Sequence, residues 1–432
     1  MKRRTIKGIV GAVLCAVLLG VFLLFKSAYV KPAKTSTAKD FTTKGQVLAM
    51  QLSESAFGRQ TYNPKNGYLV LTDASGKTRV FHSGKMGSGE PIWTATGIFY
   101  GGAESEYLTN EQGTKIIPRD ISPDHEYARY QRDKGRGFIA FYALGSDPGG
   151  YQQPVLVGDS EKTKSFDVRG AYMSMGVCDD ILYAVAQTKL APNLLEQAKA
   201  VYQKHAGVTN AELAAIDNFD IFVQVYPENH PHDPQVLESV PRDERFSHPV
   251  GEFQRVGDSI YLLSFLLDHP NAQRGDGKDP KAGHLVLEEW NLKQHTRRAI
   301  DIVDDKGQFV DLVIDETGGE KGILVGSEYR FVTRTGKVFS VDVTTGLAKH
   351  LYTFKELPGG GRIPRFAVTA SAVYRLDNGE NTNAKLNFSR YVFKTGKYEH
   401  LFDVESLRAY RRGDVHVAEI AVNPEWEKTL SQ

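Results

Sequence analysis

Short apolar runs separated by turn residues dominate the chain from about Gln46 onward. The clearest unit runs from Tyr329 to Phe354 and reads YRFVTRTGKVFSVDVTTGLAKHLYTF, with turn residues at Thr335–Gly336 and at Thr345–Gly346. Alternation of apolar and polar residues is typical of strands with one buried face, and Gly in a short polar stretch is typical of a hairpin turn. We therefore predict a three-strand antiparallel meander here.

Similar units recur along the chain. Ala372 to Phe402 repeats the pattern, with Thr395–Gly396 in the place of Thr345–Gly346, about fifty residues later. Weaker copies cover five more segments: Gly67–Phe81, Gly97–Ile117, Phe138–Val168, Ile181–Pro227 and Ser259–Ile300. Repeats of this length built from antiparallel strands are typical of β-propeller blades. We predict an all-β fold, a propeller of six to eight blades with seven favoured. The alternating run Val415–Val422 is expected to pair with the first blade and close the ring.

One segment departs from the strand pattern. Residues 192–218 carry apolar residues at helical spacing, with Pro192 at a helix start and Gly207 as a helix stop. We predict two short helices inserted in a loop, which either cap one blade or serve as a lid or docking arm.

The first residues predict a membrane anchor. Four basic residues precede an uncharged apolar run from Gly8 to Phe25, which as a helix spans roughly 27 Å, close to the thickness of a bilayer core. The excess of positive charge before the run favours a cytoplasmic N-terminus. A cleaved signal peptide is the alternative, but cleavage after Ala28 would put Lys26 where a small residue is wanted. We expect a single-pass plasma-membrane protein whose body lies outside the cytoplasm.

Domain boundaries follow from this pattern. Residues 1–26 form the predicted cytoplasmic tip and transmembrane anchor. Residues 27–45 are rich in Lys, Thr, Ser and Ala and are predicted to be a flexible stalk. Residues 46–432 form the predicted extracytoplasmic propeller.

Charge and cysteine content narrow the functional classes. Lys and Arg total 53 and Asp and Glu total 52, so no basic surface for nucleic acid is expected. Cys178 is the only cysteine outside the apolar run that contains Cys15, which excludes an internal disulfide and a cysteine-based zinc site in the exterior domain. An exported domain with so few cysteines is compatible with a bacterial source.

The segment KVFSVDVTTGLAKHL, Lys337 to Leu351, resembles the strand-turn core of pyrroloquinoline-quinone-like and WD40-like propellers. In those repeats an aspartate and a Thr-Gly turn link the outer strands. The resemblance implies the propeller fold and no particular function. Quinone-dependent members also show recurrent tryptophans, whereas this chain holds only Trp93, Trp290 and Trp426 and lacks neighbouring cysteines. The resemblance therefore implies no cofactor.

Few residues carry a chemical signature, and we assign no catalytic residue. Sequence patterns of serine hydrolases, zinc peptidases and calcium loops are absent from the chain. The best metal candidates are His230, His232 and Asp233 in NHPHDP, although the prolines at positions 227, 231 and 234 also fit a plain solvated connector. Two loops are candidate binding segments, and their residues are Asp268, His269, Asp276 and Asp279 in the first and Gly359, Gly360, Gly361 and Arg362 in the second.

Two functions from different classes fit the sequence. The favoured hypothesis is a membrane-anchored binding or scaffolding module that recognises another envelope protein or a glycan, because anchoring raises the effective concentration for partners in the same membrane. The alternative is an extracytoplasmic propeller enzyme, a hydrolase or lyase, acting on a glycan or lactone-like substrate. The enzyme hypothesis predicts convergent titratable side chains in the central channel.

Overall fold

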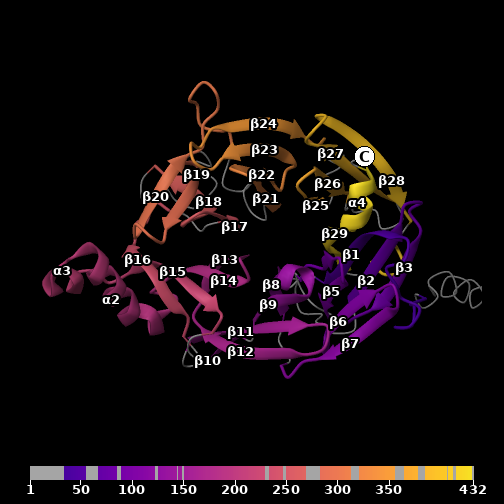
Figure 1. The fold of residues 1–432 in the computed structure, drawn as a ribbon, viewed down its shortest axis with the longest axis horizontal. Coiled ribbons are helices and arrows are strands. Elements are labelled where there is room, and N and C mark those ends of the chain that lie inside the picture. The colour runs from indigo at the N-terminus through magenta and orange to yellow at the C-terminus, as the bar shows by residue number, and fades with distance from the viewer. Residues whose placement is uncertain are drawn as a thin grey trace, which may run out of the picture.

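The chain forms a ring of seven antiparallel sheets (Figure 1). The computed structural model describes residues 34–54, 67–84, 89–121, 125–143, 145–147, 150–228, 233–246, 250–268, 283–312, 321–355, 364–377, 385–405, 407–411 and 415–430. Seven sheets confirm the predicted β-propeller and the favoured blade number.

Three blades follow one another from the start of the ring, and their strands are given from the channel outward. Blade 1 holds β4 (Ile92–Thr94), β5 (Gly97–Gly101), β6 (Ser105–Asn110) and β7 (Gly113–Pro118). Blade 2 holds β8 (His125–Arg132), β9 (Gly137–Ala143), β11 (Gly150–Asp159) and β12 (Thr163–Arg169), and a short β10 (Gly145–Asp147) pairs with β11. Blade 3 holds β13 (Tyr172–Cys178), β14 (Ile181–Gln187), β15 (Phe219–Tyr226) and β16 (Gln235–Pro241).

Four more blades complete the ring. Blade 4 holds β17 (Val250–Val256), β18 (Ser259–Leu267), β19 (Gly283–Asn291) and β20 (Thr296–Asp301). Blade 5 holds β21 (Lys321–Val325), β22 (Glu328–Val332), β23 (Lys337–Asp342) and β24 (Ala348–Thr353). Blade 6 holds β25 (Arg365–Val368), β26 (Ala372–Leu376), β27 (Leu386–Val392) and β28 (Lys397–Val404). Blade 7 holds β29 (Val415–Val422), β1 (Gln46–Glu54), β2 (Gly67–Asp73) and β3 (Thr78–His82).

The ring closes through its last strand. β29 pairs antiparallel with β1, with Leu48 opposite Val422 and Ala49 opposite Ala421. The predicted latch is therefore confirmed, and blade 7 joins one strand from the C-terminal part of the chain to three from the N-terminal part. Such a closure pairs the inner edge of β1, which would otherwise be left open.

The hydrophobic core lies between blades. Most buried apolar residues of the described chain fall into seven clusters, and each cluster joins two neighbouring blades. Phe99 of blade 1, for example, packs with Phe138 of blade 2 at a ring-centroid distance of 5.5 Å. Each sheet therefore buries both faces against its neighbours, as expected for a ring of repeats.

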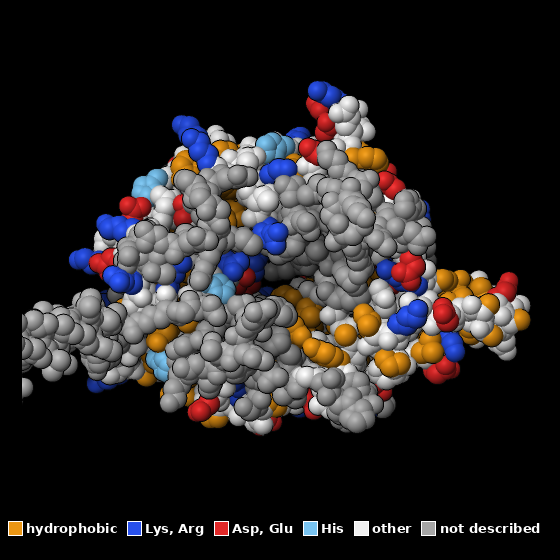
Figure 2. All heavy atoms as spheres, turned by 180° about the vertical axis from the view of Figure 1, so that it is seen from behind, with side chains coloured by type: hydrophobic (Ala, Val, Ile, Leu, Met, Phe, Trp, Pro, Cys, Tyr) orange, Lys and Arg blue, Asp and Glu red, His pale blue; other side chains and the backbone are white. Residues whose placement is uncertain are grey.

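Antiparallel order within each blade gives the ring two unlike faces. The turns between the first and second strands and between the third and fourth strands lie on one face, here named the turn face. The remaining connections lie on the other face, here named the loop face. Figure 2 shows the molecule from behind the view of Figure 1, with Lys and Arg side chains near a hollow at its centre.

The helical insertion lies where it was predicted, between β14 and β15. It comprises a 3-10 turn (Pro192–Leu194), α2 (Leu195–Ala206) and α3 (Asn210–Ala214). Gly207 ends α2 with a left-handed φ of 67°. The backbone N–H of Val236 in β16 donates to the Gln197 side chain of α2 at 3.2 Å, and Ala198 is fully buried. The insertion thus packs on the outer strand of blade 3.

The N-terminal end of the described chain packs onto the ring. Phe41 is fully buried and stacks on Phe81 at 5.3 Å, and the Ser36 N–H donates to the Val80 carbonyl at 2.7 Å. Ser36 and Phe41, which belong to the segment 27–45 predicted as a stalk, therefore contact blade 7. The predicted transmembrane run Gly8–Phe25 lies outside the described residues. Among the described residues, no helix has both the length and the apolar character to cross a bilayer.

Candidate functional site

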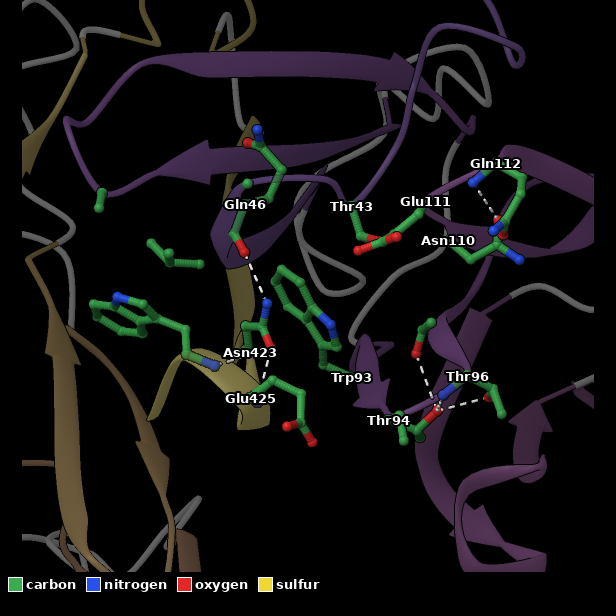
Figure 3. A pocket seen from close by; sticks show the side chains of 16 residues that line it. Thr43, Gln46, Trp93, Thr94, Thr96, Asn110, Glu111, Gln112, Asn423 and Glu425 are labelled. Carbon is green, nitrogen blue, oxygen red and sulfur yellow. Dashed lines mark hydrogen bonds between the residues drawn. The ribbon is translucent and has the colours of Figure 1, made fainter. Parts of the chain in front are cut away.

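A cavity of about 550 Å³ opens on the turn face between blades 7 and 1. Figure 3 labels ten of the side chains that line it. In this view Trp93 lies between Asn423 and Gln46 on one side and Asn110, Glu111 and Gln112 on the other. The lining comes from the starts and ends of strands far apart in the sequence, and it also includes Trp426. We name this cavity the tryptophan groove.

Trp93 is positioned by the innermost strand of blade 1. It lies in β4, opposite Ile98 of β5, and its partly buried indole packs against the cluster that joins blades 7 and 1. The turn that follows is held by the Thr94 hydroxyl, which donates to the Gly97 carbonyl at 3.1 Å. The Thr96 hydroxyl donates to the Gly135 carbonyl of blade 2 at 2.7 Å. These bonds fix the strand end from which the indole projects.

Trp426 is positioned by a short helix after the latch strand. Asn423 caps α4 (Pro424–Leu430) by accepting the Glu425 N–H at 2.9 Å, and its own amide donates to the Gln46 carbonyl at 2.9 Å. The indole of Trp426 packs near the rings of Tyr374 and Phe402, at 6.5 and 6.4 Å. The closure of the ring therefore also brings Trp426 into the lining of the groove.

Amide, hydroxyl and carboxylate groups complete the groove. The Asn110 carboxamide oxygen accepts the Gln112 N–H at 2.9 Å and so shapes the turn between β6 and β7, while Glu111 and Gln112 are exposed. The groove thus combines two part-exposed indoles with polar side chains that can donate and accept. Such a lining suits a ligand that has both C–H faces and hydroxyl groups.

A second candidate lies in the central channel. Lys321 is an ion-pair partner of both Glu90, at 2.5 Å, and Glu419, at 3.7 Å. These residues belong to β21, the segment before β4, and β29, and a channel cavity of about 310 Å³ is lined by Glu90 and Lys321. The register of β29 against β1 shifts by one residue between Val417 and Glu419, a bulge of the kind that re-aims a side chain.

Electrostatics single out Glu419 in this channel cluster. Burial raises the pKa of its carboxyl, and this outweighs the opposing effect of Lys321. The nearby Glu90 carboxylate raises the pKa of Glu419 further. A carboxyl that keeps its proton at a higher pH than an ordinary carboxyl is suited to general-acid chemistry.

Of the sequence-predicted site residues, the structure describes Asp233 and Asp268, and neither lines either cavity. Asp233 accepts a hydrogen bond from the Asn193 amide at 2.6 Å and so ties its connector to the helical insertion, while its companions His230 and His232 lie outside the described residues. Asp268 is exposed directly after β18. Its companions His269, Asp276 and Asp279 and the candidate loop residues Gly359, Gly360, Gly361 and Arg362 also lie outside the described residues.

Sequence reasoning missed the residues that the structure brings together. Two of the three tryptophans of the chain, Trp93 and Trp426, line one groove. The scarcity of tryptophan was the available signal, since a rare aromatic residue that is enriched at binding hot spots occurs outside the core-type runs at both positions. The grouping of Glu90, Lys321 and Glu419 had no sequence signal, because three distant strands meet only in the closed ring.

Comparison with known proteins bears on the fold. No known protein family and no curated protein matches this sequence. Among solved structures, the chain is similar to the β-propeller domain of the Trilobed protease from Pyrococcus furiosus, with 13% identity, a TM-score of 0.46 and coverage of 83% of this chain and 95% of that chain.

Two more solved structures are similar at the same distant level. Apo AztD from Citrobacter koseri shows 12% identity and a TM-score of 0.41, with 87% of this chain and 98% of that chain covered. A Mycobacterium tuberculosis puromycin-hydrolyzing peptidase shows 11% identity and a TM-score of 0.42 over 87% of this chain, which spans 56% of the peptidase. These likenesses concern the fold alone.

Proposed function

We propose that this protein is a membrane-anchored, extracytoplasmic propeller that binds a glycan of the cell envelope in the tryptophan groove. The observation that carries the proposal is that Trp93 and Trp426 line one cavity together with polar side chains. The basic and apolar N-terminal pattern supports the anchor and the location outside the cytoplasm.

The chemistry of the groove favours a saccharide over an apolar ligand. The C–H face of a sugar ring packs on an indole, while its hydroxyls exchange hydrogen bonds with amides and carboxylates. Asn110, Glu111, Gln112 and Glu425 line the groove and supply such groups. Its volume of about 550 Å³ lies within the range of small-ligand sites. Tethering to the membrane would keep the groove close to envelope glycans.

Binding can be followed through the protein's own fluorescence. Trp290 is fully buried, so a ligand in the groove should change the emission of Trp93 and Trp426 alone. The full-length protein in detergent would be screened on a glycan array and then titrated with each binding oligosaccharide. We expect Trp93→Ala or Trp426→Ala to weaken binding at least about tenfold, the effect of losing an aromatic contact worth about 1.4 kcal/mol.

The control is Tyr398→Ala, because Tyr398 is 45% exposed on β28 and takes no part in the groove. It should leave glycan affinity unchanged. The proposal is contradicted if no array glycan alters the fluorescence, or if both tryptophan variants keep full affinity.

The channel cluster favours a second candidate function, an enzyme that acts on a glycan or lactone-like substrate. The observation behind it is the raised pKa of Glu419 beside Lys321 and Glu90. Glu419→Gln keeps the shape of the side chain but cannot transfer a proton. If the enzyme candidate is right, hydrolysis or elimination measured with such substrates should fall by about a hundredfold or more in this variant. Equal turnover in both proteins would exclude Glu419 as the acid.

A further inference from the structure

Two histidines and a glutamate from three separate elements meet at the rim of the ring. His205 lies in the last turn of α2, Glu238 lies in β16, and His295 lies in the turn between β19 and β20 of blade 4. One ligating atom from each of the three lies within 4.8 Å of the other two. They join the helical insertion to two neighbouring blades, near the labels α2, β16 and β20 in Figure 1.

Both oxygens of one buried carboxylate face an imidazole. The Nδ1 atom of His295 lies 2.6 Å from Oε1 of Glu238, and the Nδ1 atom of His205 lies 3.6 Å from Oε2. The Glu238 side chain is 5% exposed, whereas those of His205 and His295 are 17% and 39% exposed. The group therefore has a buried carboxylate at its base and one side open to solvent.

The geometry leaves one nitrogen without a partner. Nδ1 of His205 is buried and makes no hydrogen bond within the described structure, since 3.6 Å is too long for one. Two ligands at zinc distances of about 2.1 Å in tetrahedral arrangement stand roughly 3.4 Å apart. The separation between His205 and Glu238 is close to that value, so an ion would satisfy a nitrogen that is otherwise orphaned.

Stacking of the two imidazole rings limits the charge that the two histidines can carry together. The imidazoles of His205 and His295 stack with centroids 3.5 Å apart at 21°. Two imidazolium ions this close would repel each other, so at least one ring is neutral, which is the form that binds a metal. His295 also holds a left-handed φ of 56°, a backbone conformation that is uncommon for residues other than glycine.

We propose that His205, Glu238 and His295 bind one divalent transition-metal ion of the zinc class. Two imidazole nitrogens and one carboxylate oxygen suit Zn²⁺ or Co²⁺, whereas Ca²⁺ and Mg²⁺ prefer oxygen ligands alone. Three protein ligands leave a fourth position for water on the exposed side. The ion would also fasten the helical insertion to blades 3 and 4. This inference is independent of the glycan proposal.

Metal titration of the full-length protein in detergent tests the proposal. After treatment with a chelator, the protein would be titrated with ZnCl₂ by calorimetry and with CoCl₂ by visible absorption, where tetrahedral Co²⁺ gives intense bands. We expect one ion per chain and a higher unfolding temperature with Zn²⁺. His295→Asn keeps a residue that tolerates the left-handed turn, and Glu238→Gln keeps the shape, so each should weaken binding at least about tenfold.

A matched control is available on blade 4. His284 also pairs with a carboxylate, Asp301, at 3.0 Å and stacks on Phe309, but among the described residues it belongs to no group of three potential metal ligands. His284→Asn should leave zinc affinity unchanged. Unfolding temperatures of the metal-free variants show whether each one folds. The proposal is overturned if the wild type binds no stoichiometric ion, if both site variants keep full affinity, or if His230→Asn or His232→Asn abolishes binding instead.

Discussion

Asp342 organises the turn that links the two outer strands of blade 5. Its carboxylate accepts hydrogen bonds from the hydroxyls of Ser327, Thr344 and Thr345 and from the N–H groups of Thr344 and Thr345. The turn then brings Gly346 against the neighbouring blade, where its carbonyl accepts the Val303 N–H at 3.1 Å. In blade 7, Asp73 and Gly76 repeat the arrangement. The aspartate and glycine seen in the sequence thus shape the turn and join blades.

Gly346 is required for two separate reasons, and Gly396 for only one. Gly346 has a φ of 75°, and a Cβ there would lie 2.1 Å from the Asp301 carbonyl oxygen of blade 4. Gly396 has a φ of 66°, but its Cβ would meet only the Tyr391 hydroxyl at 3.9 Å. We expect Gly396→Ala to cost about 1 to 2 kcal/mol in left-handed strain, and Gly346→Ala to cost roughly 3 kcal/mol or more. Urea unfolding of both variants measures the difference, and equal losses would contradict the contact.

The turn aspartate also predicts a pH dependence. Hydrogen bonds, first from the Thr344 hydroxyl and also from Ser327 and Thr345, hold the pKa of Asp342 well below its usual value. A carboxyl whose pKa is lower in the folded state stabilises the fold above its unfolded pKa of about 3.9. That contribution is lost as the pH falls through the folded pKa.

The variant Asp342→Asn isolates this effect, because its amide cannot ionise. We expect it to be less stable than wild type by about 1 kcal/mol or more at pH 7, and the gap to shrink below about pH 4. Urea unfolding at pH 7 and at pH 3 measures both values. A gap of the same size at the two pH values would show that the charge of Asp342 is unimportant.

At the residue scale, the sequence predicted turns and missed sites for the same reason. A turn is determined by neighbours within a few residues, so Thr345–Gly346 and Thr395–Gly396 were visible in the pattern. The groove pairs Trp93 with Trp426, and the rim group joins His205 to His295, across large distances in sequence. No local pattern reports such contacts.

At the scale of elements, buried charges join blades 1 and 2. The Arg129 guanidinium of β8 bonds Glu106 of β6 at 2.6 Å and Glu126 at 2.7 Å, and Arg119 bonds Glu106 at 2.9 Å. The Tyr142 hydroxyl also donates to Glu106, at 2.6 Å. These ion-paired side chains are at most 1% exposed. Burial alone would raise the pKa of Glu106, but Arg129 and Arg119 outweigh it and lower that pKa.

Removal of one arginine should therefore cost far more than loss of a surface pair. Arg129→Met leaves Glu106 and Glu126 facing each other with one cation fewer, and we expect a loss of about 3 to 5 kcal/mol in unfolding free energy. Lys115→Met is the control, since Lys115 pairs with Glu161 on the surface and is 46% exposed, and it should cost less than about 1 kcal/mol. Chemical denaturation compares them. Similar losses would mean that the buried cluster adds little.

The elements themselves were largely predictable. Alternation located at least two strands of every blade, but the predicted segments left out most of the innermost strands. Pro192 marked the start of the helical insertion, and Gly207 marked the end of α2. The bulges that precede Glu238 in β16 and Glu419 in β29 were not predicted, because a bulge depends on the partner strand across the ladder. The burial of Phe41 was not predictable either, since Phe41 lies alone among polar residues and its contact with Phe81 is long-range in sequence.

At the scale of the whole molecule, the closed ring determines both stability and function. The cluster between blades 6 and 7 contains Val415, Val417 and Ile420 of β29 together with Tyr374 and Phe388 of blade 6. Without β29, β1 would lose its inner partner and this cluster would lose one side. The same strand carries Glu419 into the channel and leads to Trp426 in the groove. Formation of both candidate sites therefore depends on closure of the ring by β29.

A pair of truncations separates the role of the latch from that of the last helix. A chain that ends at Arg411 lacks β29, and we expect it to lose cooperative thermal unfolding because the open edge of β1 and the blade 6 face are exposed to water. A chain that ends at Asn423 keeps β29 and loses only α4, so it should still unfold cooperatively, with a smaller loss of stability and no glycan binding.

A peptide that spans residues 412–423 provides the decisive complement. Added to the chain that ends at Arg411, it should restore a cooperative transition whose midpoint rises with peptide concentration. The reason is that a peptide which binds the folded state and not the unfolded state stabilises the folded state by mass action. The same peptide with Val417→Asp and Ile420→Asp places two charges in the cluster between blades 6 and 7 and should not rescue. Wild-type stability in the chain that ends at Arg411 without peptide would show that the ring does not depend on its last strand.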